Sequence, residues 1–158
     1  MHFDDPDIYF MKQALEEARK GAENGEVPVA ALVVYEGRII GIGKNYKHID
    51  PTAHAEILAM REASQHLKRW NLNGCTLYVT LEPCPMCAGA IVLARIQRLV
   101  YGASDPRAGA CGTLYNIVQD SRLNHRCDIR KGVLAEESSE LLWEYFKKRR
   151  NNSNKVNS

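Results

Sequence analysis

Hydrophobic residues recur along the chain at two different spacings, and the spacing changes from one segment to the next. Over residues 8–22 the apolar positions lie three and four apart, which predicts an amphipathic helix. Asp5-Pro6 is a favourable cap and first residue for this helix, and Asn24-Gly25 is a typical helix end. We therefore expect the chain to begin with a helix whose first residue is Pro6.

Short β-rich segments and further helical segments then alternate. We expect strands at residues 27–35, 38–43, 75–81, 98–102 and within 127–134, and helices at 53–67, 85–95, 113–120 and 136–150. Only Glu36-Gly37 separates the first two strands, so these should form an antiparallel hairpin. A hairpin followed by alternating strands and helices predicts the α/β class, with one sheet covered by helices.

Length and composition indicate a single domain. The chain has 158 residues, of which 45% are hydrophobic and 25% charged, and these values suit one globular unit with its own core. Neither an internal repeat nor a second domain is visible, so we expect one domain over residues 1–150. Residues 151–158 are polar and are expected to form a disordered tail.

The sequence also favours a cytoplasmic location. The first residues lack the basic and apolar regions of a signal peptide, and the longest apolar run, residues 27–35, is too short to cross a membrane. The chain has five cysteines, and an odd number without an export signal argues against a disulfide framework. A metal-binding or catalytic function for some of them is the better expectation.

Charge is nearly balanced over the whole chain but not at its end. The formal net charge is +2, whereas the segment from Lys147 onward holds five basic residues and no acidic one. A solvated, frayed C-terminus is the commoner meaning of such a segment. The alternative is a patch that contacts the phosphates of a nucleic acid.

Cys84 and Cys87 carry the first chemical signal. They lie three residues apart where a strand passes into a helix, so both thiolates can approach one zinc ion. The helix N-terminus favours the thiolate form. Taken alone, this Cys-x-x-Cys pair fits a redox pair or half of a structural zinc site about as well as it fits a catalytic site.

His54 and Glu56 lie at the start of the helix expected over residues 53–67. At a helix start both side chains can approach one site, so His54 can be the third zinc ligand while Glu56 stands beside the metal. Three protein ligands leave one position open, which is typical of a catalytic zinc that activates water. Glu56 can then act as the general acid and base that moves the proton.

The order His-x-Glu followed by Pro-Cys-x-x-Cys is the known signature of zinc nucleobase deaminases. Beyond this signature the chain resembles the bacterial tRNA adenosine deaminases, within the cytidine-deaminase-like superfamily, over roughly residues 6–150. The resemblance rests on residues 25–29, 50–56, 77–90, 101–105 and 123–126. It implies a three-layer α/β/α fold with a five-stranded mixed sheet, one zinc ion per chain and a homodimer. The implied reaction is hydrolysis of adenosine to inosine at the wobble position of a tRNA anticodon, chiefly in an arginine tRNA.

The resemblance also implies substrate contacts. Asn45, Ala55 and Asp105 match positions that contact the target nucleotide, and the basic end of the last helix matches a region that approaches the anticodon loop. The resemblance therefore favours an RNA-binding patch over a merely solvated C-terminus. The residues of this patch are Lys147, Lys148, Arg149 and Arg150. Asn124 and His125 are weaker candidates for RNA contact, because a turn with a satisfied side-chain hydrogen bond explains them equally well.

Two positions depart from the family pattern. Ala30 stands where the family usually has glycine, and Cys111 stands where it usually has a small residue without a thiol. Two other functions share the same metal motif and stay open. One is a deaminase of a free base or nucleotide, such as guanine or cytosine, and the other is a non-catalytic zinc-bearing subunit that binds RNA.

Overall fold

The structure is a computed structural model that describes residues 5–46, 48 and 50–156. Its helices are α1 (Pro6–Glu23), α2 (Ala55–Leu67), α3 (Pro85–Ala94) and α4 (Ala135–Val156), with the short 3-10 helix η1 (Ile117–Gln119). Its strands are β1 (Ala30–Tyr35), β2 (Arg38–Lys44), β3 (Thr76–Leu81), β4 (Arg98–Ala103) and β5 (Asp128–Arg130). None of the helices in the described ranges is both long and apolar enough to cross a membrane.

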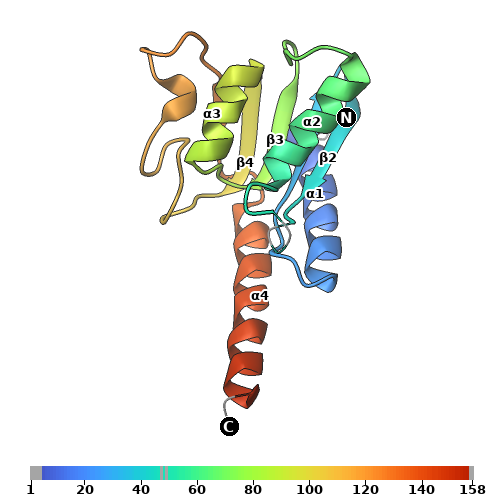
Figure 1. Ribbon diagram of the computed structural model, residues 1–158, viewed down its shortest axis with the longest axis vertical. Coiled ribbons are helices and arrows are strands. Elements are labelled where there is room, and N and C mark those ends of the chain that lie inside the picture. Colours follow the sequence, from blue (N-terminus) through green and yellow to red (C-terminus); the bar gives the residue numbers. More distant parts are fainter. Residues whose placement is uncertain (1–4, 47, 49, 157–158) are drawn as a thin grey trace.

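The strands form one mixed sheet in the order β2-β1-β3-β4-β5. Strand β1 is antiparallel to both β2 and β3, whereas β3, β4 and β5 run parallel. Helix α2 packs on β1 and β2 and contacts α3, while α1 and α4 pack on the other side of the sheet against β3 and β4 (Figure 1). The three-layer α/β/α fold with a five-stranded mixed sheet is therefore confirmed.

Each face of the sheet has its own apolar core. One cluster joins the sheet to α2 and α3 and includes Val33, Ala59 and Ile91, all fully buried. The other joins the sheet to α1 and includes Met11 and Leu32. Because both faces are covered, the chemistry must lie at an edge where loops and helix ends meet.

The carboxyl ends of β2, β3 and β4 lie at the same edge of the sheet. Leu81 at the end of β3 pairs with Ala103 at the end of β4, and Lys44 at the end of β2 pairs with Ala30 at the start of β1. The helices α2 and α3 both begin at this edge. Side chains that are far apart in the sequence therefore meet there.

Two glycines of β2 explain the position of α2. A Cβ atom on Gly43 would collide with the carbonyl oxygen of Ala55, and one on Gly41 would collide with that of Ala59. The backbones of α2 and β2 therefore approach more closely than any side chain would allow. This contact fixes the first turn of α2 at the edge of the sheet.

The hairpin prediction is confirmed, since β1 and β2 are antiparallel and joined at Glu36 and Gly37, both with positive φ. The predicted helix over residues 113–120 is wrong, because this segment forms only η1. The backbone N–H groups of Cys111 and Thr113 donate to Glu82, and Leu114 N donates to Gly109, so the segment folds as a compact loop.

In two other predictions one end differs from the structure. Strand β1 begins at Ala30, three residues later than predicted, and α4 continues to Val156 instead of ending at Arg150. Residues 151–156, which the sequence assigned to a disordered tail, are thus helical, and residues 157–158 lie outside the described part of the chain. Figure 1 shows that the lower half of α4 extends well beyond the sheet.

Candidate active site

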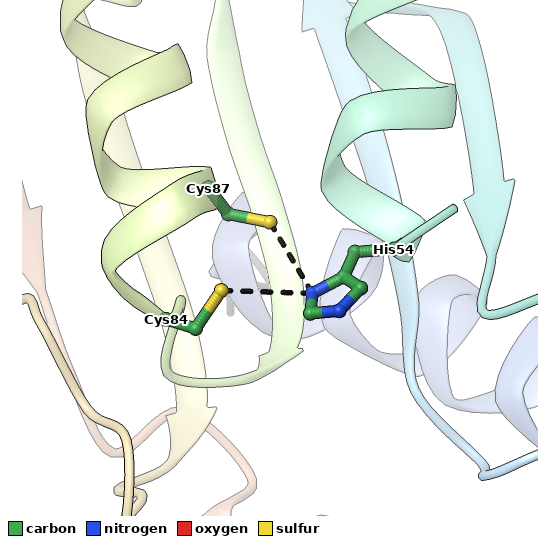
Figure 2. A group of neighbouring side chains, drawn as sticks. All are labelled: His54, Cys84 and Cys87. Carbon is green, nitrogen blue, oxygen red and sulfur yellow. Dashed lines mark hydrogen bonds between the residues drawn. The ribbon is translucent and has the colours of Figure 1, made fainter. Parts of the chain in front are cut away.

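His54, Cys84 and Cys87 converge at the edge of the sheet (Figure 2). The Nδ1 atom of His54 lies 3.6 Å from the Sγ atom of Cys84 and 3.6 Å from that of Cys87. Their three candidate ligand atoms lie within 4.8 Å of one another. Among the residues that the structure describes, this is the group that could hold a metal ion.

Two helix starts direct these side chains. His54 and Cys84 are the N-cap residues of α2 and α3, and both have an extended backbone, so their side chains project from the helix ends. Pro85 follows Cys84 at the first helical position, where its missing N–H does no harm. Cys87 lies in the first turn of α3 and points toward His54.

The spacing of the three donors fits zinc. A sulfur at about 2.3 Å and a nitrogen at about 2.0 Å from one tetrahedral ion lie about 3.5 Å apart. The observed 3.6 Å between His54 Nδ1 and each sulfur matches this value. One imidazole and two thiols form a set that zinc commonly selects, and three ligands leave a fourth position for water.

The two cysteines titrate as a pair. A hydrogen bond from the Cys87 thiol is the main reason why the pKa of Cys84 is lowered to about 3, and a hydrogen bond from His54 lowers it further. The same hydrogen bond with Cys84 and burial raise the pKa of Cys87. The pair therefore holds a thiolate on Cys84, which is the form that binds metals.

Glu56 lies in the first turn of α2 and is only 4% exposed. Burial raises the pKa of its carboxyl group to about 7, against a hydrogen bond from its own backbone N–H. A group that titrates near neutral pH can both accept and donate a proton under physiological conditions. Glu56 and His54 line the same cavity, as does Cys84.

That cavity has a volume of about 950 Å³ and reaches from His54 and Cys84 to α4. Apart from the residues already named, its walls come from the segment before β1, the loop after β4 and one face of α4. These residues are Val27, Val29, Leu81, Ala103, Ser104, Pro106, Arg107, Ala108, Ser139, Leu142, Trp143, Phe146 and Ser153, together with Asn45, Glu82, Asp105, Arg149 and Arg150.

The structure places some of the predicted substrate residues in this cavity and others outside it. Asn45 and Asp105 line the cavity. Asn45 is buried, and its Oδ1 accepts a hydrogen bond of 2.9 Å from the backbone N–H of Ala55. Ala55 is itself fully buried and does not line the cavity. Its N–H group supports Asn45 instead of facing the cavity.

Asp105 organises its own loop. One carboxylate oxygen, Oδ1, accepts hydrogen bonds from the backbone N–H groups of Arg107 and Ala108. Its carbonyl oxygen accepts a further one from Gly109. The loop thus forms a tight turn in the wall of the cavity, and the Asp105 side chain holds its first residues.

The remaining predicted RNA contacts divide into two groups. Arg149 and Arg150 line the cavity, whereas Lys147 and Lys148 lie on α4 outside the lining. Asn124 and His125 do not line it either, and the Nε2 atom of His125 lies 2.7 Å from the carbonyl oxygen of Ile96. For His125 the structure therefore favours the satisfied turn over an RNA contact.

Two aromatic residues of the cavity were not singled out from the sequence. Trp143 and Phe146 line it and are 56% and 48% exposed. They lie three residues apart on α4, and Arg150 follows Phe146 after one more turn, so the three share a face. This spacing was the available signal, but it is equally typical of a helix that packs on a core.

Comparison with known proteins gives consistent results at the level of sequence. The chain matches the model of the MafB19-like deaminases over residues 5–150. It is 47% identical to a tRNA-specific adenosine deaminase of Bacillus subtilis over 146 residues, which cover 91% of each chain. It is 49% identical to one of Haemophilus influenzae over 147 residues, which cover 91% of this chain and 85% of the relative.

Solved structures support the same assignment. One structure, from a study of A-to-I editing by tRNA:A34 deaminases at the wobble position of transfer RNA, matches with a TM-score of 0.81 and 45% identity, over 85% of this chain and 99% of that chain. A guanine deaminase from Nitrosomonas europaea matches with a TM-score of 0.71 and 28% identity, over 85% of this chain and 81% of that chain. The similarity between this chain and the tRNA-specific adenosine deaminases extends over most of this chain and most of each relative. The chain therefore belongs to the family of the tRNA-specific adenosine deaminases.

Proposed function

We propose that the chain hydrolyses adenosine to inosine at the wobble position of a tRNA anticodon, chiefly in an arginine tRNA, and that it uses one zinc ion per chain. The observation that carries the proposal is the convergence of His54, Cys84 and Cys87, with His54 and Cys84 lining the same cavity as the buried Glu56. The names of the relatives add the substrate class. Because tRNA is the proposed substrate, we also propose a cytoplasmic location.

The reaction replaces the 6-amino group of adenine with oxygen from water and releases ammonia. A zinc ion held by His54, Cys84 and Cys87 would lower the pKa of a water molecule and so supply hydroxide. Glu56 accepts the proton of the attacking water and delivers it to a ring nitrogen and then to the leaving amine. Asn45 stands at the same cavity wall, where its amide can hydrogen-bond the base.

The far end of the cavity suits a single-stranded RNA loop. Trp143 and Phe146 offer exposed rings on which unstacked bases can lie. Arg150 lies beside them, and Lys147 and Lys148 lie on the same helix, so the phosphates of the same loop find positive charge. An unpaired loop nucleotide also costs less to turn outward than a base in a duplex.

Deamination of a free base is the second candidate, because a guanine deaminase shares the fold at 28% identity. A free base would use only the part of the cavity near Glu56. It would leave the aromatic and basic face of α4 without a function. The third candidate, a non-catalytic RNA-binding subunit, leaves the buried Glu56 unexplained, since a structural zinc site needs no acid.

The test is inosine formation at the wobble adenosine of an arginine tRNA anticodon stem-loop. Glu56→Gln removes the acid with little change in shape, so we expect the rate to fall by about 10²–10⁴-fold or more. Glu62→Gln is the matched control, because Glu62 lies on the same helix but is exposed, and it should keep the native rate. All three proteins should contain one zinc ion per chain.

The alternatives give different results. Turnover of free bases without inosine in the RNA would establish the free-base enzyme. Equal background rates for the native chain and both variants, at full zinc content, would establish the binding subunit. A native protein that carries no zinc yet deaminates the RNA would remove the metal from the proposal while leaving the reaction.

We also propose that the chain forms a homodimer. Helix α3 exposes Leu93 at 77% and Met86 at 37%, although most of this short helix is apolar. Exposed large apolar residues beside a buried core are typical of an interface. Measurement of the molar mass in solution tests this, and a monomer at micromolar concentration would contradict it.

A further inference from the structure

Glu82 is a buried carboxylate that the proposed reaction does not use. It follows β3 directly and is only 2% exposed. Within the described part of the chain it accepts four hydrogen bonds, and all of them come from the loop after β4. The donors are the backbone N–H groups of Asp105, Cys111 and Thr113, at 3.0, 3.0 and 3.1 Å, and the hydroxyl group of Thr113.

These hydrogen bonds connect two parts of the active-site edge. Glu82 lies two residues before Cys84, on the segment that leads into α3. The loop that it holds, residues 104–113, forms one wall of the cavity through residues 104–108. Because a carboxylate binds N–H donors more strongly than a neutral acceptor does, one side chain fixes the loop at three points.

Gly109 shows how closely the loop fits around the carboxylate. A Cβ atom at Gly109 would lie 2.5 Å from the Oε1 atom of Glu82 and 2.5 Å from the carbonyl oxygen of Asp105. No side chain can occupy that space without displacing one of them. The position of the loop therefore depends on direct contact between its backbone and Glu82, and small changes at Glu82 must be transmitted to Asp105.

We propose that Glu82 is a positioning residue for the RNA substrate, which fixes residues 104–108 as the wall that receives the nucleotides next to the target adenosine. This rests on the proposed function. The candidate zinc ligands and Glu56 lie at the N-terminal ends of α2 and α3, and none of them is a partner of Glu82 in these four hydrogen bonds. Loosening the loop therefore weakens RNA binding more than it slows the chemical step.

The experiment measures KM and kcat for inosine formation in the anticodon stem-loop. Glu82→Gln places an amide donor against the N–H donors of the loop. We expect KM to rise about tenfold, because this is the loss of affinity that follows from losing a hydrogen bond to a charged group. The value of kcat should stay within about threefold of the native value. Thr113→Val removes only the hydroxyl donor from an exposed position and should raise KM about threefold. Zinc content should equal that of the native chain in both variants.

Asp7→Asn is the control for general destabilisation. Asp7 is an equally buried carboxylate with several hydrogen bonds, but it lies outside the cavity and should leave KM unchanged. A lower kcat at native KM would mean that Glu82 only supports the fold, and native KM in both variants would also overturn the inference. If Glu82→Gln does not fold, Thr113→Val decides. If the native chain itself makes no inosine in the RNA, the proposed function fails, and this inference fails with it.

Discussion

Asn45 lies between the end of β2 and the start of α2 and serves both the fold and the cavity. Its Oδ1 atom accepts the N–H of Ala55, which leaves its NH₂ group for the cavity. Asn45→Asp keeps an acceptor for Ala55 at a helix N-terminus, where negative charge is tolerated, but removes the donor. We expect kcat/KM for the stem-loop to fall by about 10–100-fold with little change in melting temperature.

The control for Asn45 is Asn71→Asp. Asn71 also accepts a backbone N–H through its Oδ1 atom, from Asn73, but it lies away from the cavity. This variant should keep the native kcat/KM. Equal activities of Asn45→Asp and the native chain would mean that the base does not use the Asn45 amide.

Single residues differ in how far the sequence alone could reveal them. His54, Glu56, Cys84 and Cys87 belong to two short motifs, so their chemistry could be inferred together from local spacing. Glu82 could not be assigned a function, because its partners lie 23 to 31 residues further along the chain. Nothing in a linear pattern shows that a buried carboxylate will meet the N–H groups of a distant loop.

Among the elements, α4 contributes most to the cavity beyond the metal site. Its position relative to the loop after α1 is fixed by Tyr145 and Arg149, which both donate to the carbonyl oxygen of Gly25 at 3.0 Å. The guanidinium of Arg149 also lies over the ring of Tyr145. Arg149 is thus occupied by the fold, and Arg150 is the better candidate for a phosphate contact.

Arg150→Ala should weaken RNA binding in a salt-dependent way. Loss of one phosphate contact lowers the slope of log Kd against log salt by about 0.7–0.9, because fewer counterions are released. Titration of the anticodon stem-loop at several salt concentrations, in the inactive Glu56→Gln background, measures this slope. Lys12→Ala on the exposed face of α1 removes the same charge away from the cavity and should leave the slope unchanged. A slope unaffected by Arg150→Ala would remove α4 from the phosphate-binding surface.

Elements with a clear hydrophobic period could be predicted, and segments held by distant side chains could not. The spacing of apolar residues gave α1, α2 and α3 to within two residues at each end. Residues 113–120 were expected to form a helix, yet the N–H group of Ile117, which a helix would pair with the carbonyl oxygen of Thr113, donates to Ala110 instead. Trp143 and Phe146 illustrate the same limit, because the apolar spacing of a helix does not distinguish a core from a cavity wall.

At the scale of the whole molecule, Asp7 connects α1 to three strands. It is 4% exposed and accepts hydrogen bonds from Tyr78 on β3, from both terminal nitrogens of Arg98 on β4, and from Arg130 on β5. Arg98 begins β4, so this cluster lies at the opposite end of that strand from the candidate metal ligands. It stabilises the fold at the end of the sheet that the reaction does not use.

The cluster predicts how stability depends on acid. Hydrogen bonds from Arg98, Tyr78 and Arg130 hold the pKa of Asp7 well below its usual value of 3.8, so its contribution is complete above that pH and is lost as the pH falls below it. Asp7→Asn leaves the arginines without their anion and should lower the free energy of unfolding by about 3 kcal/mol at pH 7. Thermal unfolding of both proteins from pH 7 to pH 2.5 should show the difference narrowing below about pH 4, because Asp7 then takes up a proton in the unfolded state while it stays charged in the folded state. A difference that stays constant down to pH 2.5 would mean that the charge of Asp7 contributes nothing and that only its shape and hydrogen-bonding capacity matter.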